Sequence, residues 1–115
     1  GYRVINMSWK PLYILKNPTN RWGMEDILDW NVYEWKHWWP SSKAHLNRIC
    51  VPATEQVIGA QFCTFEQTFE SEVSFVLENV TAFAEKSWSI VRYRSFDEFL
   101  AVSEYIRKKC YRLII

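Results

Sequence analysis

The sequence lacks several features that would assign a chain to a class at once. No apolar run reaches the length of a membrane-spanning helix, so we expect no transmembrane segment, and the N-terminus does not have a signal-peptide pattern. Acidic and basic residues nearly cancel, and the net charge of +1 gives no electrostatic reason to expect nucleic acid or an anionic membrane as a partner. Internal repeats and low-complexity segments are also absent.

Common catalytic and metal-binding motifs are missing as well. The sequence has no P-loop, no glycine-rich dinucleotide motif and no serine–histidine–aspartate pattern. The three cysteines, Cys50, Cys63 and Cys110, are scattered, and neither His37 nor His45 has a partner at metal-ligand spacing. We therefore expect no metal and no cofactor, and the cysteines indicate no particular cellular compartment.

Length and composition fit a single domain over residues 1–115. Hydrophobic residues at 49% and charged residues at 23% are ordinary for a soluble globular chain. The chain is much shorter than a complete (β/α)8 barrel. Because it starts directly in strand-like sequence, we expect it to have been cut from a longer chain.

Aromatic side chains are what the sequence has in excess, at 17% of all residues. Six of the tryptophans crowd the first third of the chain: Trp9, Trp22, Trp30, Trp35, Trp38 and Trp39. An indole ring suits both core packing and stacking on a sugar ring. For any single tryptophan, burial in a core or an interface is the more common role.

Hydrophobic periodicity predicts the order strand, helix, strand, helix, helix. Short apolar runs predict strands over 2–8 and 57–65. Apolar residues at helical spacing predict helices over 23–39 and 71–88, and a capping-box spacing at Ser95 predicts the start of a helix over 95–113. Two strands separated by a helix favour parallel pairing with a right-handed crossover, and thus an α/β fold.

The connection over 43–54 has no clear period and is predicted to be a loop or a short helix. Two strands alone make a poor core, because both faces and both edges need covering. The predicted elements therefore look like a sector of a larger α/β barrel.

Aromatic and polar side chains follow both predicted strands, where an α/β protein meets its ligands. These residues are Asn6, Trp9, Tyr13, Phe65, Glu66 and Gln67. Carboxylate and amide groups bind hydroxyls, and aromatic faces meet the C–H side of a sugar ring, so the mixture suits a neutral, hydroxyl-rich ligand. Two alternatives remain: Tyr13 as a core tyrosine and Glu66 as a solvated strand-end carboxylate.

Three segments resemble family 20 glycoside hydrolases, the β-N-acetylhexosaminidases. Residues 1–13, GYRVINMSWKPLY, are similar to the family's late strand, where a "GY-VIN-SW-PLY" run is typical. Residues 59–67, GAQFCTFEQ, resemble the last barrel strand, which ends in a tryptophan and an acid. Residues 82–89, AFAEKSWS, resemble the "A-AER-WS" helix that follows it. Residues 40–55 and the C-terminal helix match only loosely.

The resemblance implies a fold and a sugar site. The chain would be the C-terminal sector of a (β/α)8 TIM barrel, the last two parallel strands with their helices, completed by the rest of the barrel or by a second copy. Tyr13 would bond the substrate's acetamido carbonyl, and Trp9 would line the acetamido pocket. Phe65 would wall the sugar, and Glu66 or Gln67 would contact the outer hydroxyls of an N-acetylhexosaminide.

Two departures from the family qualify this expectation. Phe65 replaces the family's tryptophan, and the acid position two residues after that aromatic is held by Gln67. The family's adjacent Asp-Glu pair belongs to an earlier strand and is not among these residues. Family 20 enzymes use the substrate's own acetamido group as nucleophile, which the Asp orients while the Glu acts as general acid.

The resemblance thus implies a part of an enzyme that hydrolyses terminal N-acetylhexosamine residues, inactive on its own. The alternative is a non-enzymatic α/β interaction or carbohydrate-binding module. Such a module would dimerise through exposed strand edges and the aromatic face of its first helix.

Overall fold

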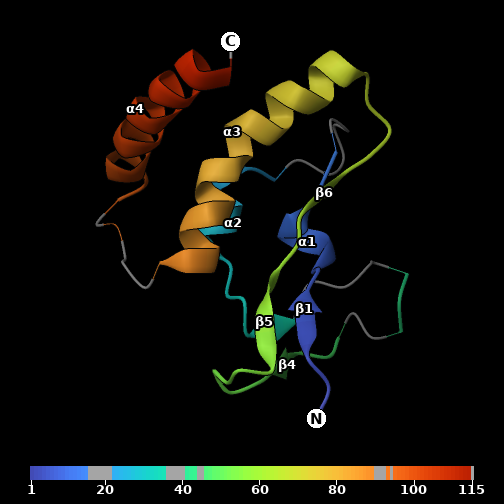
Figure 1. Cartoon of the computed structure of the whole chain (residues 1–115). Coiled ribbons are helices and arrows are strands. Elements are labelled where there is room, and N and C mark those ends of the chain that lie inside the picture. Colours follow the sequence, from blue (N-terminus) through green and yellow to red (C-terminus); the bar gives the residue numbers. More distant parts are fainter. Residues whose placement is uncertain (16–21, 36–40, 44–45, 90–92, 94, 115) are drawn as a thin grey trace.

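The computed structural model describes residues 1–15, 22–35, 41–43, 46–89, 93 and 95–114. The elements in chain order are β1 (Val4–Asn6), α1 (Trp9–Leu12), β2 (Tyr13–Ile14), α2 (Met24–Asp29), β3 (Glu34–Trp35), β4 (Ile49–Cys50), β5 (Val57–Ala60), β6 (Cys63–Thr64), α3 (Phe69–Trp88) and α4 (Phe96–Ile114). Helices α3 and α4 lie side by side at one end, and β1 and β5 lie at the other, near the N-terminus (Figure 1). None of the described helices is long and apolar enough to cross a bilayer.

The two predicted strands pair in parallel, as expected, so the chain is a small α/β domain. Strand β1 pairs with β5, and β2 pairs with β6 in the same parallel sense. Each predicted strand is therefore divided in two. Between the two ladders, the Gln61 N–H donates to the Asn6 carbonyl at 3.0 Å and continues the pairing.

Both interruptions have local causes. Pro11 lies in α1 and has no N–H to give to a strand ladder, which separates β1 from β2. In β5, Ile58 is an extra residue between the pairs Val4–Val57 and Ile5–Gly59. Gly59 has a φ of +146°, which side-chain-bearing residues rarely adopt, and such a residue suits a β-bulge.

The prediction of a helix over 23–39 is wrong beyond Asp29. Helix α2 begins as expected, with the Asp26 carboxylate accepting from the Gly23 N–H at 3.0 Å. It ends because Asn31 forms a turn: its side-chain oxygen accepts from the Tyr33 N–H at 2.9 Å. The chain then enters β3, which pairs with β4 in antiparallel fashion, and β4 lies in the connection predicted as loop or short helix. Residues 36–40 and 44–45 lie outside the described residues.

The two C-terminal helices are confirmed. Helix α3 begins two residues before its predicted start, and the side chain of Thr68 caps it. The capping role predicted for Ser95 is present, because its hydroxyl accepts from the Glu98 N–H at 3.2 Å. Of the connection between the two helices, residues 90–92 and 94 lie outside the described residues.

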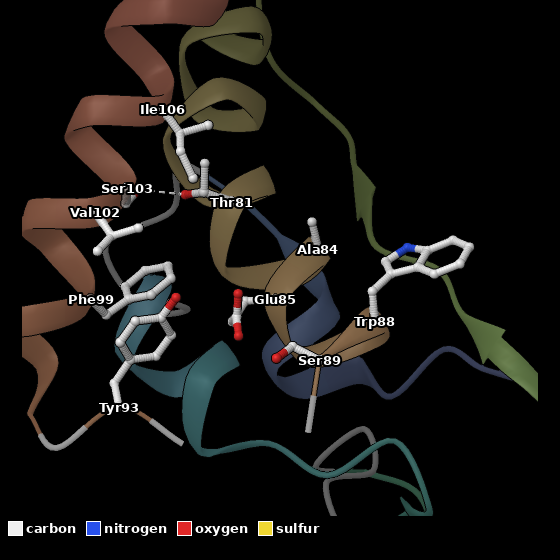
Figure 2. A pocket seen from close by; sticks show the side chains of 10 residues that line it. All are labelled: Thr81, Ala84, Glu85, Trp88, Ser89, Tyr93, Phe99, Val102, Ser103 and Ile106. Carbon is white, nitrogen blue, oxygen red and sulfur yellow. Dashed lines mark hydrogen bonds between the residues drawn. The ribbon is translucent and has the colours of Figure 1, made fainter. Parts of the chain in front are cut away.

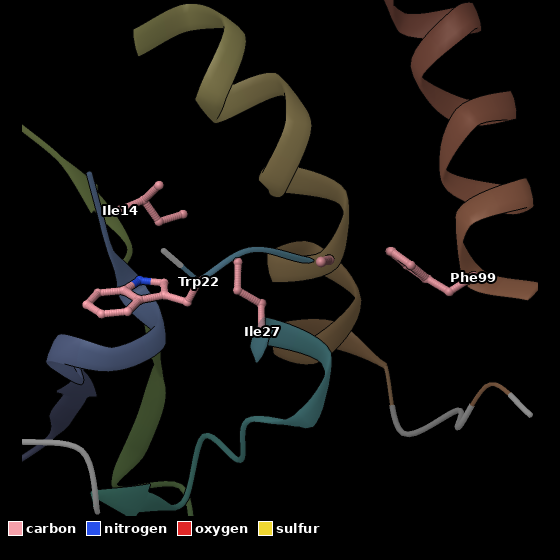
Figure 3. Packing of buried hydrophobic residues seen from close by; sticks show 5 residues of the cluster. Ile14, Trp22, Ile27 and Phe99 are labelled. Atoms are coloured by element: carbon pink, nitrogen blue, oxygen red, sulfur yellow. The ribbon is translucent and has the colours of Figure 1, made fainter. Parts of the chain in front are cut away.

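The core lies among β2, α2, α3 and α4 rather than beneath the β1–β5 sheet. Ile14, Trp22 and Ile27 pack together on one side of α3, and Phe99 reaches the same helix from the other side (Figure 3). Ala82 of α3 is fully buried in the same cluster. A small side chain there lets both groups approach the helix backbone closely.

The β1–β5 sheet is open by comparison. Val4, Ile5 and Ile58 are 40%, 48% and 55% exposed. Strands of parallel sheets are normally buried on both faces. The exposed apolar side chains of this sheet are therefore suited to contact with additional protein elements.

Asn6 connects four parts of the chain. Its amide donates to the carbonyls of Val32 and Glu34 at 2.8 and 3.0 Å. Its side-chain oxygen accepts from the backbone N–H and the hydroxyl of Ser8 at 3.0 and 2.7 Å. The Asn6 side chain is fully buried, and its two bonds with Ser8 are buried while those to Val32 and Glu34 are partly buried.

We expect Asn6→Ala to lower the free energy of unfolding by about 2–4 kcal/mol, because it removes all four hydrogen bonds of this buried side chain. Urea denaturation followed by circular dichroism measures the loss. The control Ser8→Ala removes only one of these hydrogen bonds and should cost about 1 kcal/mol. A value for Asn6→Ala within about 0.5 kcal/mol of wild type would contradict the role assigned to this network.

Candidate functional site

Tyr13 and Phe65 meet where the paired strands end. The pairing of β2 with β6 sets Tyr13 opposite Cys63, so the residue two positions further, Phe65, lies beside it. The two rings stack with centroids 5.5 Å apart and an interplanar angle of 28°. Phe65 is 54% exposed, and Tyr13 is partly buried. The pair therefore offers an aromatic surface with one hydroxyl to a ligand.

Glu66 follows the stack in an unusual backbone conformation. Its φ is +61°, which lies in the left-handed region. Residues other than Gly, Asn and Asp adopt this conformation at an energetic cost. The side chain is exposed, so its carboxylate is open to a ligand or to water. This conformation also turns the chain sharply between Phe65 and Gln67, which places consecutive side chains in different directions.

Gln67 presents a different situation. Its amide nitrogen and oxygen are both buried and have no hydrogen-bond partner among the described residues. Buried amides nearly always have partners, so this side chain is poised to gain some. A ligand hydroxyl or another protein group could supply them.

The structure places Trp9 mainly in packing. Its ring lies edge-on to that of Trp22, with the ring centroids 4.8 Å apart. Trp22 belongs to the core cluster, and Trp9 packs against that cluster. Asn6 is committed to the fold by its four hydrogen bonds and is not open to a ligand. Of the predicted site residues, the structure thus brings together Tyr13 and Phe65, followed directly in the chain by Glu66 and Gln67.

One neighbouring contact was not predicted from the sequence. The Thr64 hydroxyl donates to the Glu72 carboxylate, which ties the end of β6 to the first turn of α3. An acid in the first turn of a helix that closely follows a strand was the available signal for this contact. The contact fixes the segment from Phe65 to Thr68 at both ends.

Tyr13, Phe65, Glu66 and Gln67 together make up the candidate site. It offers stacked rings, a phenol, an exposed carboxylate and a buried amide. The described residues contain no group of His, Cys, Asp and Glu side chains that could hold a metal ion. Comparison with protein-family models, with curated proteins and with solved structures finds no match to this chain.

The backbone of Glu66 generates a stability prediction. Replacement by glycine removes the left-handed penalty, so Glu66→Gly should be at least as stable as wild type despite the added freedom of its unfolded chain. Glu66→Val should lower the free energy of unfolding by about 1–2 kcal/mol, because a β-branched residue tolerates positive φ poorly. Urea denaturation measures both.

The matched control is Glu70→Gly, the same replacement at an exposed position in α3. It should cost about 0.5–1 kcal/mol, since glycine is unfavourable in a helix. Equal losses for glycine at positions 66 and 70 would show that the backbone at Glu66 is not strained.

Proposed function

We propose that the chain is the C-terminal portion of a β-N-acetylhexosaminidase, supplying part of the wall that binds a terminal N-acetylhexosamine. The observation that carries the proposal is the Tyr13–Phe65 stack at the ends of two paired parallel strands. These residues belong to separate segments that each resemble the family. Their meeting in space is what a shared sugar site requires.

The chemistry of the surface supports a sugar as ligand. Aromatic faces pack against the C–H side of a pyranose ring, and the acetamido carbonyl needs a donor such as the Tyr13 hydroxyl. The exposed Glu66 carboxylate and the unpartnered Gln67 amide suit the outer hydroxyls. Phe65 gives a smaller surface than tryptophan, which favours a modest affinity.

The open sheet supports the barrel as the larger context. Val4, Ile5 and Ile58 are apolar and exposed on a parallel pair of strands, a situation that neighbouring strands and helices of a barrel would relieve. In this proposal the acid pair lies on another strand. The chain alone therefore binds sugar but does not hydrolyse it.

We expect N-acetylglucosamine to produce a saturable change in tryptophan fluorescence. Phe65→Ala should weaken binding about tenfold, because the loss of one stacking face costs about 1–1.5 kcal/mol. Tyr13→Phe should weaken binding while leaving the fold intact, since it removes only the hydroxyl. Circular dichroism verifies folding of each variant.

The matched control is Phe69→Ala, which removes an exposed phenylalanine four residues away, at the start of α3. It should leave sugar affinity unchanged. No response to sugar from the folded wild type would count against a preformed half-site. Release of chromophore from a chromogenic N-acetylglucosaminide by this chain would contradict the location of the acid pair on another strand.

The same open sheet favours a second candidate, a non-enzymatic module that pairs with another copy of itself. Among the described residues the β1–β5 sheet has only two strands, and its outer edges, with exposed Ile5 and Ile58, are suited to such association. In this case sedimentation should show a concentration-dependent dimer, which Ile5→Lys together with Ile58→Lys should dissociate. A chain that sediments as a monomer at every concentration would exclude this candidate.

A further inference from the structure

A cavity of about 350 Å³ lies between α3 and α4. Its apolar walls include Ala84, Phe99, Val102 and Ile106, and its polar groups include Glu85 and Tyr93. Figure 2 shows the Glu85 carboxylate and the Tyr93 hydroxyl pointing toward each other, with the Phe99 ring beside them. The volume lies near the lower end of the range for small-molecule sites, about 300–1,000 Å³.

The cavity exists because α4 touches α3 at few points. Phe99, 2% exposed, anchors α4 in the core, and the hydroxyls of Thr81 and Ser103 hydrogen-bond at 2.6 Å. Val102 and Ile106 face the space between the helices but remain 39% and 44% exposed. A single ring or branched aliphatic group placed there would remove this apolar surface from water.

The Thr81–Ser103 hydrogen bond also restricts the occupant. It joins the two helices across the space between them (Figure 2), so a long partner helix could not lie there without breaking it. A compact ligand can occupy the cavity beside the bond.

The charge around the cavity is negative. Glu85 is the one charged side chain among the described residues that line it. Loss of solvent, the charge of Glu85 and a hydrogen bond to that carboxylate raise the pKa of Tyr93 above its usual value, and Glu98 adds to the effect. The raised pKa favours the protonated form of the Tyr93 hydroxyl. The carboxylate has further acceptor positions that a ligand donor can use.

We propose that this cavity binds a small arylalkylamine, with its ammonium group on Glu85 and its ring against Phe99, Val102 and Ile106. The carboxylate favours a cation and repels an anion, while the apolar walls exclude ligands that lack a hydrophobic body. Neighbouring aromatic rings add attraction for an ammonium group. The site is formed by α3, α4 and two residues between them, Ser89 and Tyr93, and does not depend on the sugar site proposed above.

Isothermal titration calorimetry with three matched probes tests the proposal. Phenethylammonium should bind about tenfold or more tightly than phenethyl alcohol, its neutral counterpart, because a charge-assisted hydrogen bond replaces a neutral one. Phenylacetate, an anion of similar shape, should bind more weakly than either. Added salt should reduce the preference for the amine.

Two variants assign the binding to the cavity. Glu85→Gln should reduce the affinity for phenethylammonium to that for the alcohol, while the alcohol binds as before. Glu78→Gln, which neutralises an exposed glutamate two turns earlier on α3, is the matched control and should change neither affinity. Val102→Trp should fill the cavity and abolish binding of both probes, with folding verified by circular dichroism.

Equal affinity of the wild type for amine and alcohol would overturn the proposal. The same holds if the folded wild type binds none of the probes, or if Glu85→Gln keeps its preference for the amine. Loss of amine binding in Glu78→Gln would also overturn it, since the attraction would then be a general effect of surface charge.

Discussion

The pairing of two distant parallel strands depends on one buried amide. The backbone carbonyl of Asn6 accepts a hydrogen bond from the Gln61 N–H on the neighbouring strand. Its side chain hydrogen-bonds the turn before β3 and Ser8, just before α1. Without that side chain, residues 4–8 would be held only by a short ladder whose apolar groups are largely exposed. Because these hydrogen bonds fix the backbone around Asn6, they also fix the direction of α1 and hence the position of Tyr13 opposite β6.

Helix α3 relates the two sites to one another. Its first turn is tied to the end of β6 by Glu72, beside the Tyr13–Phe65 surface, and its last turns carry Glu85 at the cavity between α3 and α4. Ala82 lies between, fully buried, with core residues on one side and Phe99 on the other. The helix thus connects the surface proposed to bind a sugar with the cavity proposed to bind an amine.

Much of the secondary structure could be predicted because local signals agreed with tertiary packing. The parallel pairing followed from two apolar runs separated by a helix, and Ser95 caps α4 as its spacing indicated. The helix over 23–39 was overestimated, because Leu28, Val32 and Trp35 keep helical spacing through a turn that Asn31 makes with its own side chain. Periodicity does not detect such local competition.

The candidate site was predictable to a similar degree. Tyr13 and Phe65 could be placed together, since carboxyl ends of parallel strands share one edge. The burial of Asn6 could not be foreseen, because its partners are backbone carbonyls 26 and 28 residues away. The cavity beside Glu85 could not be predicted from the sequence either. Val102 and Ile106 have the spacing of core residues, and only the structure shows that α4 leaves them uncovered.

The edge-on contact of Trp9 with Trp22 has an optical consequence. Two indoles whose ring centroids are 4.8 Å apart and whose planes lie at 72° couple their electronic transitions. Such coupled chromophores give a pair of circular-dichroism bands of opposite sign, which neither ring produces alone. The contact joins α1 to the segment that precedes α2, so the paired bands report the packing of the N-terminal half separately from the helical signal of α3 and α4.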